Sequence, residues 1–271
     1  MAMRYEESPP PPGLRSLVHR IWRLVGDAAE GPAPFQRVMP DGRAELIFNF
    51  ADPFESWSGE AVRQQPLALL VGPNRRAMGI RPTGAVDLIG VRFRPEALSG
   101  WLGVGGSDLL DRAYDLADVP APLDRSLHEQ LFDAAGQDRR IAVLHRHLAS
   151  AASRLRPDIR LGAAVDLAMA DDRARPDAVA QAVGMSHRQL SRLLRERLGF
   201  GAKPLVRLGR FQRVLRALDR PGRHSVAAVA ARSGYFDQAH LTRDFRLFAG
   251  IPPARYLREA RELARHFIAE G

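Results

Sequence analysis

The stretch that decides the fold is residues 230–250, AARSGYFDQAHLTRDFRLFAG, because it repeats residues 180–199, AQAVGMSHRQLSRLLRERLG. The two copies align without a gap from Leu190 and Leu241 onward, and one extra residue stands in the turn of the second copy. Each copy reads as a short helix, a glycine stop, a turn and a second helix. That order is typical of a helix-turn-helix, whose second helix enters the major groove of DNA.

Local signals set the limits of the helices in both units. Ser186 followed by Gln189 forms a capping box and predicts a helix from His187, while Ser225 and Asp237 are the expected N-caps in the second unit. Between the units a longer helix is predicted from residue 203 until residues 221–222, Pro-Gly, end it. A helix is also predicted before the two units, over residues 158–170, with Leu161, Val165 and Leu167 facing inward. Another is predicted after the two units, over residues 254–268.

The two predicted recognition helices each leave a polar face opposite their apolar stripe. In the first, the stripe of Leu190, Leu193, Leu194 and Leu198 leaves Arg188, Ser191, Arg192 and Arg195 outside. In the second, Leu241, Phe245 and Phe248 face inward and leave Gln238, Ala239, Thr242, Arg243 and Arg246 outside. Since glutamine pairs with adenine and arginine with guanine in the major groove, these nine residues are the candidate DNA contacts.

Net charge separates the chain into a neutral and a basic part. Residues 158–271 hold 21 Lys and Arg against 12 Asp and Glu, whereas residues 1–157 hold 19 of each. The whole excess of +9 therefore lies on the segment with the repeat, which indicates a polyanion-binding module joined to a part with another task.

Composition excludes several functions. There are no cysteines, so disulfides, thiolate metal sites and cysteine nucleophiles are excluded. Neither a signal peptide nor an apolar run of about 18 residues is visible, so we expect a soluble, cytoplasmic protein without a membrane partner. Before residue 120 the only histidine is His19, and we expect no metal, no cofactor and no catalytic residues.

The first 115 residues predict short strands separated by Gly and Pro. The clearest are Leu17–Val25, Phe35–Met39, Ala44–Phe50, Leu67–Val71 and Val86–Phe93. Their alternation and punctuation favour an antiparallel sandwich or small barrel. The fold class is therefore α+β, with a β-rich N-terminal domain, a helical linker and an all-α C-terminal domain.

Polar residues cluster at two places in these strands. Asp41, Arg43 and Glu45 follow one another by a turn, and Arg92 and Arg94 flank Phe93. Both groups are candidates for lining an effector pocket, and surface ion pairs are the alternative that we favour for them. Between residues 124 and 155 two amphipathic helices are predicted, the second capped by Asp138, which either brace the N-terminal domain or form a dimer face.

The C-terminal segment resembles the AraC/XylS family of bacterial transcription regulators. The residues that carry the resemblance are Ser233–Phe245 and Phe248–Tyr256, and it covers about residues 158–261. It implies a seven-helix domain in which a long helix joins two helix-turn-helix units that read adjacent major-groove segments. The first unit departs from the family pattern at residues 199–204, GFGAKP.

The N-terminal half resembles, less specifically, the cupin-like effector or oligomerisation domains that precede such modules. Residues 40–42 with 46–49, and residues 90–95, carry that resemblance. The predicted division is 1–120 for the β-rich domain, 121–157 for the linker, 158–261 for the DNA-binding domain and 262–271 for a helix end and tail.

Together these observations predict a transcription regulator that is not an enzyme and that responds to a small-molecule effector. The expected partners are double-stranded promoter DNA, the effector, a second copy of the chain and, for an activator, RNA polymerase. The alternatives are a regulator without a ligand, a cupin-like enzyme fused to a DNA-binding module, and a DNA binder with little sequence preference.

Overall fold

Two antiparallel sheets form the N-terminal half in the computed structural model, which describes residues 3–27, 33–57, 61–119, 125–171, 174–220 and 225–259. The larger sheet has the strand order β1-β2-β9-β4-β7-β10 and the smaller has β3-β8-β5-β6. The strands are β1 (Met3–Ser8), β2 (Val18–Gly26), β3 (Gln36–Val38), β4 (Glu45–Asn49), β5 (Phe54–Trp57), β6 (Val62–Gln64), β7 (Ala68–Val71), β8 (Met78–Pro82), β9 (Val86–Phe93) and β10 (Ala113–Asp115).

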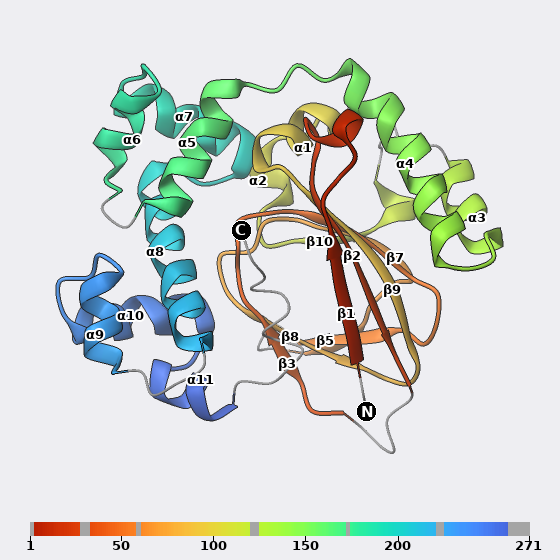
Figure 1. Cartoon of the computed structure of the whole chain (residues 1–271), viewed down its shortest axis with the longest axis horizontal. Helices are drawn as coiled ribbons and strands as arrows, with labels where there is room; N and C mark the ends of the chain where they lie inside the picture. Colours follow the sequence, from red (N-terminus) through yellow and green to blue (C-terminus); the bar gives the residue numbers. More distant parts are fainter. Residues whose placement is uncertain are drawn as a thin grey trace.

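Alternation along β4 explains how the larger sheet is covered on both faces. Leu46 and Phe48 point into an apolar core that they share with helices, whereas Glu45, Ile47 and Asn49 point to the opposite face, toward the smaller sheet. The helices on the first face are α1 (Pro95–Leu102), α2 (Gly106–Leu109), α3 (Arg125–Asp133) and α4 (Gln137–Arg154). Buried leucines of α3 and α4 belong to this core, as the bracing interpretation of these helices predicts (Figure 1).

Seven helices follow in the described part of the C-terminal half. They are α5 (Ile159–Ala170), α6 (Pro176–Ala182), α7 (His187–Leu198), α8 (Ala202–Asp219), α9 (Val226–Arg232), α10 (Gln238–Ala249) and α11 (Pro253–Glu259). Figure 1 shows α6 and α7 near one end of α8 and α9 and α10 near the other. The α+β class, the antiparallel sheets and the two helix-turn-helix units predicted from the sequence are confirmed.

Several sequence expectations about element limits need correction. The strand β1 was not predicted, because MRYEES alternates only at Met3 and Tyr5, which is too short a pattern, and the strand is held by its pairing with β2. The N-cap of α4 is Gly136 at φ 84°, so Asp138 lies inside the first turn and is not the cap. Leu167 is 38% exposed, because the buried stripe of α5 runs instead through Leu161, Ala164, Val165 and Ala168. Three predictions lie outside the described residues. They are the end of the long helix at 221–222, residues 260–268 of the last helix, and the tail at 262–271.

The two halves of the chain share an apolar core. Met39, from the loop between β3 and β4, is 3% exposed and belongs to the same cluster as Leu208 and Phe211 of α8. At a second contact, a Cβ on Gly106 of α2 would stand 2.4 Å from the backbone N of Gly199, so only glycine allows this approach of α2 to the end of α7. The N-terminal half therefore packs directly on the first helix-turn-helix unit and on α8.

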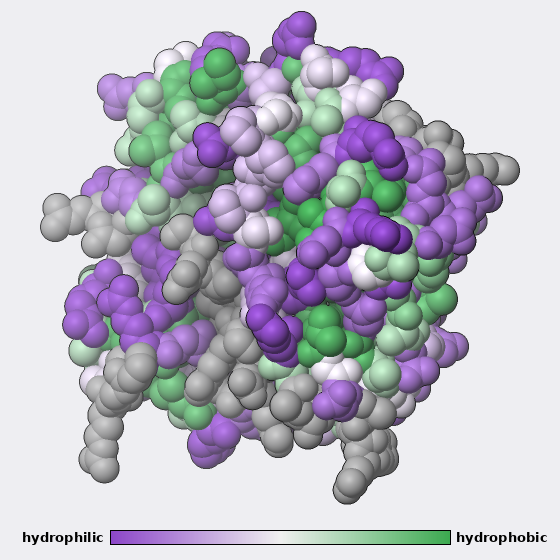
Figure 2. Space-filling model, turned by 45° about the vertical axis from the view of Figure 1, so that its right-hand side comes forward, coloured by the Kyte–Doolittle hydropathy of each residue, from purple (hydrophilic) through white to green (hydrophobic). Residues whose placement is uncertain are grey.

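Surface polarity is mixed on the side of the sheets. The face in Figure 2, which brings the right-hand side of Figure 1 forward, is largely hydrophilic with separate hydrophobic areas. The exposed large hydrophobic side chains of the sheets and their loops include Val25, Trp57, Val62 and Leu67, each between 39% and 48% exposed. No helix in the described ranges is long and apolar enough to cross a membrane.

Candidate functional site

The two helix-turn-helix units have the same build. Helices α6 and α9 are each 7 residues long, and α7 and α10 are each 12 residues long. Gly184 at φ 67° and Gly234 at φ 77° both stop the first helix. After them, the Met185 and Tyr235 amides donate to the carbonyls of Ala180 and Ala230, at 2.9 and 3.1 Å. The repeat seen in the sequence is therefore a repeat of structure.

Caps fix where each recognition helix begins. The Ser186 hydroxyl accepts from the Gln189 amide at 3.2 Å while the Gln189 side chain accepts from the Ser186 amide at 2.8 Å, which completes the predicted capping box of α7. In α10 the Asp237 carboxylate accepts from the His240 amide at 2.6 Å. The first-turn residues that would meet base edges are thus held in defined positions.

Three of the four residues expected on the polar face of α7 are exposed. These are Arg188, Arg192 and Arg195. Arg192 is 76% exposed at its side chain and lies 3.8 Å from the Glu196 carboxylate one turn on. A surface pair of this kind is weak enough to give way to a phosphate or a base.

Ser191 does not lie on the polar face of α7, where the sequence predicted it. It is 7% exposed and therefore buried. The buried stripe of α7 runs through Leu190, Leu194 and Leu198, which are four residues apart. Four residues advance a helix by about 400°, so the stripe rotates by about 40° at each step, toward the side of Ser191. Leu193 is correspondingly only half-buried.

The exposed face of α10 follows the sequence prediction more closely. Gln238, Ala239, Arg243 and Arg246 are exposed and Thr242 is half-buried. One contact was missed: Asp244 is 4% exposed, and its carboxylate pairs with Arg207 of α8 at 2.7 Å. This pair ties the recognition helix to the helix that joins the two units.

A cavity of about 70 Å³ lies between the two sheets. Its apolar wall includes Trp22, Ile47 and Leu88 of the larger sheet and Phe54 and Ile80 of the smaller. Of the five residues predicted for an effector pocket, Asp41, Arg43, Glu45 and Arg92 line it. The apolar part of the lining was not predicted from the sequence, although alternation along β4 places Ile47 on the same face as Glu45.

Arg94 does not join the other four. Its Nε donates to the Arg15 carbonyl at 2.6 Å, and its Nη1 lies 3.6 Å from Glu96. Residues two apart in a strand lie on the same face, but β9 ends at Phe93, and Arg94 follows it as the N-cap of α1. The prediction of a pocket role for Arg94 is not supported by this placement.

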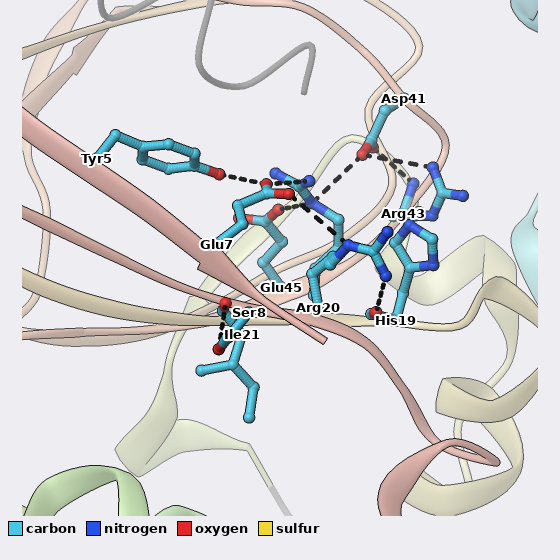
Figure 3. A network of polar contacts seen from close by, with 10 residues as sticks. Tyr5, Glu7, Ser8, His19, Arg20, Ile21, Asp41, Arg43 and Glu45 are labelled. Atoms are coloured by element: carbon cyan, nitrogen blue, oxygen red, sulfur yellow. Dashed lines mark hydrogen bonds and ion pairs between the residues drawn. The ribbon is translucent and has the colours of Figure 1, made fainter. Parts of the chain in front are cut away.

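Arg92 is the centre of the polar network at this cavity, and Figure 3 labels its partners Glu7, Asp41 and Glu45. Its side chain is 4% exposed and contacts three carboxylates: Glu45 at 2.5 Å, Glu7 at 3.0 Å and Asp41 at 3.6 Å. Tyr5 donates from its hydroxyl to Glu7. The favoured interpretation of these residues as surface ion pairs is wrong, because the pairing of β4 with β9 sets Glu45 opposite Arg92 inside the fold.

Burial shifts the proton affinities of this network. It raises the pKa of Glu45 and lowers the pKa of Arg43. For Arg92 burial opposes the charge, but Glu45 and Asp41 outweigh it and raise the pKa. Burial, with the charge of Arg43, lowers the pKa of His19 to about 3, so this ring is neutral at pH 7. Within the described ranges no group of three or more His, Asp or Glu side chains could hold a metal ion.

The loop between β3 and β4, residues 39–44, connects the cavity to the helical half. Met39, Pro40, Asp41 and Arg43 line the cavity. From the same loop, the Pro40 carbonyl accepts from Nε2 of Gln212 in α8 at 2.6 Å, and this bond is buried. The loop therefore has one side in the cavity and the other against the helix that joins the two units.

Two family models match separate parts of the chain. Residues 179–259 match the family described as a helix-turn-helix domain, and residues 6–115 match a domain of unknown function, DUF6597. None of the curated proteins compared with the chain matches it.

Among solved structures, ToxT from Vibrio cholerae is 8% identical, with 95% of this chain and 97% of that chain covered and a TM-score of 0.48. Wild-type ToxT from Vibrio cholerae strain SCE256 with a bound unsaturated fatty acid is 9% identical, with 94% of each chain covered and a TM-score of 0.44. A transcriptional regulator from Chromobacterium violaceum, described by its AraC-type DNA-binding domain, is 25% identical, with 38% of this chain and 93% of that chain covered and a TM-score of 0.36. The chain thus carries a DUF6597 domain followed by an AraC-type helix-turn-helix domain, and it is a DNA-binding transcription regulator.

Proposed function

We propose that the protein binds specific promoter sequences and that a small-molecule effector in the cavity between the sheets controls this binding. The observation that carries the proposal is the 39–44 loop, which lines the cavity and is hydrogen-bonded to α8 through Pro40 and Gln212. A ligand that favours one arrangement of this loop changes the equilibrium between two arrangements of the units by its difference in affinity for them.

Base contacts are assigned to the exposed residues of the two recognition helices. They are Arg188, Arg192 and Arg195 in α7 and Gln238, Ala239, Thr242, Arg243 and Arg246 in α10. Arg192 and Arg243 occupy equivalent places, each two residues after the leucine that begins the aligned segment. An arginine in such a place can donate from two guanidinium nitrogens to O6 and N7 of guanine, and this pair of hydrogen bonds discriminates guanine from the other bases.

The division into domains is also part of the proposal: 1–120 for effector binding or oligomerisation, 121–157 as a helical linker, 158–261 for DNA binding and 262–271 as a helix end and tail. In support, residues 155–158 are extended between α4 and α5. RNA polymerase, for an activator, and a second copy of the chain are the further partners, and α3 with α4 offers the alternative dimer face. Regulators of this type act by binding DNA rather than by catalysis.

The DNA-reading part is tested on duplexes selected from random sequence by the full-length protein. Arg192→Ala and Arg243→Ala should each weaken binding to the selected site by about 1–3 kcal/mol and change binding to random DNA much less. Arg154→Ala, an exposed arginine of α4, is the matched control and should leave both affinities unchanged. Equal losses on selected and random DNA would mean that Arg192 and Arg243 meet phosphates only.

The effector part is tested by thermal unfolding with a panel of small carboxylates, amines and sugars. A compound that raises the Tm of the protein should also change its affinity for the selected DNA, by about 1–3 kcal/mol of coupling. Gln212→Leu should keep the rise in Tm and lose the effect on DNA, whereas Ile47→Phe should lose both, since its larger ring enters the cavity. A rise in Tm that persists in Ile47→Phe would place the ligand elsewhere.

The alternative of a cupin-like enzyme predicts a bound metal. Metal analysis of the purified protein decides it, because a stoichiometric transition metal would favour the enzyme. If the protein is a regulator without a ligand, no compound of the panel should change its affinity for the selected DNA in a way that depends on Gln212.

A further inference from the structure

Phe236 is 95% exposed, the largest exposed fraction among the large hydrophobic side chains of the described ranges. Its neighbour Tyr235 is only 6% exposed and belongs to the core of the helical half. Most other large hydrophobic side chains at the surface are between 38% and 48% exposed. Phe236 therefore contributes almost nothing to the packing of its own chain.

Comparison of the two units shows that Phe236 is the extra residue of the second turn. In the first unit Gly184 is followed by Met185 and then by Ser186, the N-cap of α7. In the second unit Gly234 is followed by Tyr235, Phe236 and then Asp237, the N-cap of α10. Met185 and Tyr235 make the same backbone hydrogen bond, so Phe236 has no counterpart in the first unit and the helix-turn-helix fold does not require it.

The backbone on both sides of Phe236 is held in place. The Tyr235 amide donates to the Ala230 carbonyl at 3.1 Å, and the Tyr235 ring packs edge-on against His240 at 5.1 Å. On the other side the Asp237 carboxylate caps α10 through the His240 amide. The ring of Phe236 consequently projects into solvent from a fixed point and is not part of a loose loop.

That fixed point adjoins the part of the second unit that faces DNA. Gln238 and Ala239, in the first turn of α10, are both exposed, and so is Arg243 one turn further on. In a helix-turn-helix the N-terminal residues of the second helix contact base edges. A side chain directly before that turn therefore reaches the same major groove.

We propose that Phe236 contacts the 5-methyl group of a thymine in the DNA segment read by the second unit, and so adds a preference for thymine at one position. The thymine methyl is the apolar group that the major groove displays, and phenylalanine is among the side chains that recognise it. Burial of the ring against this methyl removes apolar surface of both partners from water. The inference rests on the DNA-reading function proposed above.

The test compares thymine with deoxyuridine, which differs only by that methyl group. In a duplex selected by the full-length protein, each thymine of the half-site read by α10 is replaced in turn by deoxyuridine. At one position the replacement should weaken binding of the unaltered protein about fourfold, the effect of one buried methyl group. Phe236→Ala should bind the thymine duplex about tenfold more weakly and should not distinguish the two duplexes at that position.

Ile159→Ala is the matched control, since Ile159 is 83% exposed at the start of α5 and lies outside the two units. It should bind both duplexes like the unaltered protein, and neither substitution should change the Tm. Unchanged affinity of Phe236→Ala, or a deoxyuridine effect that survives in this variant, would overturn the inference. Loss of transcription by RNA polymerase with unchanged DNA affinity would also overturn it and assign Phe236 to a protein contact. If the unaltered protein selects no sequence at all, the DNA-reading function itself fails.

Discussion

Arg92 shows how one residue can hold the lining of the cavity between the sheets together. The Arg92 side chain is 4% exposed, and its guanidinium offsets part of the negative charge of three carboxylates. These come from separate segments and belong to Glu7, Asp41 and Glu45. Removal of one partner from a buried ionic network leaves uncompensated charge, which costs much more than the net value of the pair.

We expect Arg92→Ala to lower the free energy of unfolding by about 3–5 kcal/mol, measured by urea denaturation at pH 7. Arg75→Ala removes the same charge from a pair with Asp111 at a side chain that is 62% exposed, and should cost less than about 1 kcal/mol. A loss below 1 kcal/mol for both variants would mean that water satisfies the three carboxylates.

His19 makes the stability of the fold depend on pH. Because its pKa is lowered to about 3 in the folded state, the unfolded chain takes up the proton first as the pH falls below about 6.5. The stabilisation that comes from the neutral ring is therefore complete above pH 6.5 and is lost progressively toward pH 3.

His19→Gln, which stays neutral, should show a smaller loss of stability between pH 7 and pH 4 than the unaltered protein. The slope that His19 contributes is at most about 1.4 kcal/mol per pH unit, and less because the ring is part-exposed. Urea midpoints across this range measure it, and parallel curves for the two proteins would contradict the assignment.

Three of the cavity residues, Asp41, Arg43 and Glu45, could be predicted from the sequence because a turn and an alternating strand place them close together. The sequence could not predict that Glu45 lies opposite Arg92, 47 residues further along the chain, because that contact depends on which strands pair. For the same reason burial of the network was not foreseen, and surface ion pairs were favoured.

At the scale of elements, the 39–44 loop is one of the parts of the N-terminal half that pack closely on the helical half. Gly42 has φ 76°, and a Cβ there would stand 2.8 Å from Cδ2 of Leu208, a residue of α8 that is 3% exposed. An alanine at this position has both an unfavourable backbone and a contact that the packed core must relieve.

Gly42→Ala should therefore destabilise the protein by more than Gly103→Ala, by about 1 kcal/mol or more in urea denaturation. Gly103 has a similar φ of 68°, and a Cβ there would meet nothing within 4 Å, so it isolates the cost of the backbone. Equal losses in the two variants would show that the loop does not press on α8.

Elements with strong local signals were predictable. The helices α7 and α10 begin at the residues that their caps predict, His187 and Gln238. By contrast, β1 is held by pairing with β2 along its whole length, and its alternation of apolar and polar residues is too short to predict a strand. The polar face of α7 was predicted with an error at Ser191, because four leucines left two possible centres for the stripe and packing selected the one nearer Ser191.

At the scale of the whole molecule, α8 sets the distance between the two units. It has 18 residues, which corresponds to about 27 Å of helix, and its contacts with α7 and α10 hold one recognition helix toward each end (Figure 1). One turn of DNA is about 34 Å, so we expect a connecting helix of this length to present both recognition helices to successive major-groove segments on one face. Residues 1–157 carry no net charge, so we expect the phosphate contacts to come from the helical half.

A footprint of the full-length protein on its selected duplex tests this arrangement most directly. We expect two protected major-groove segments on one face of the DNA, with centres about 10 base pairs apart. Random duplexes at the same salt concentration should give no defined footprint. One short protected segment, or equal protection of random DNA, would contradict the reading of DNA by two units.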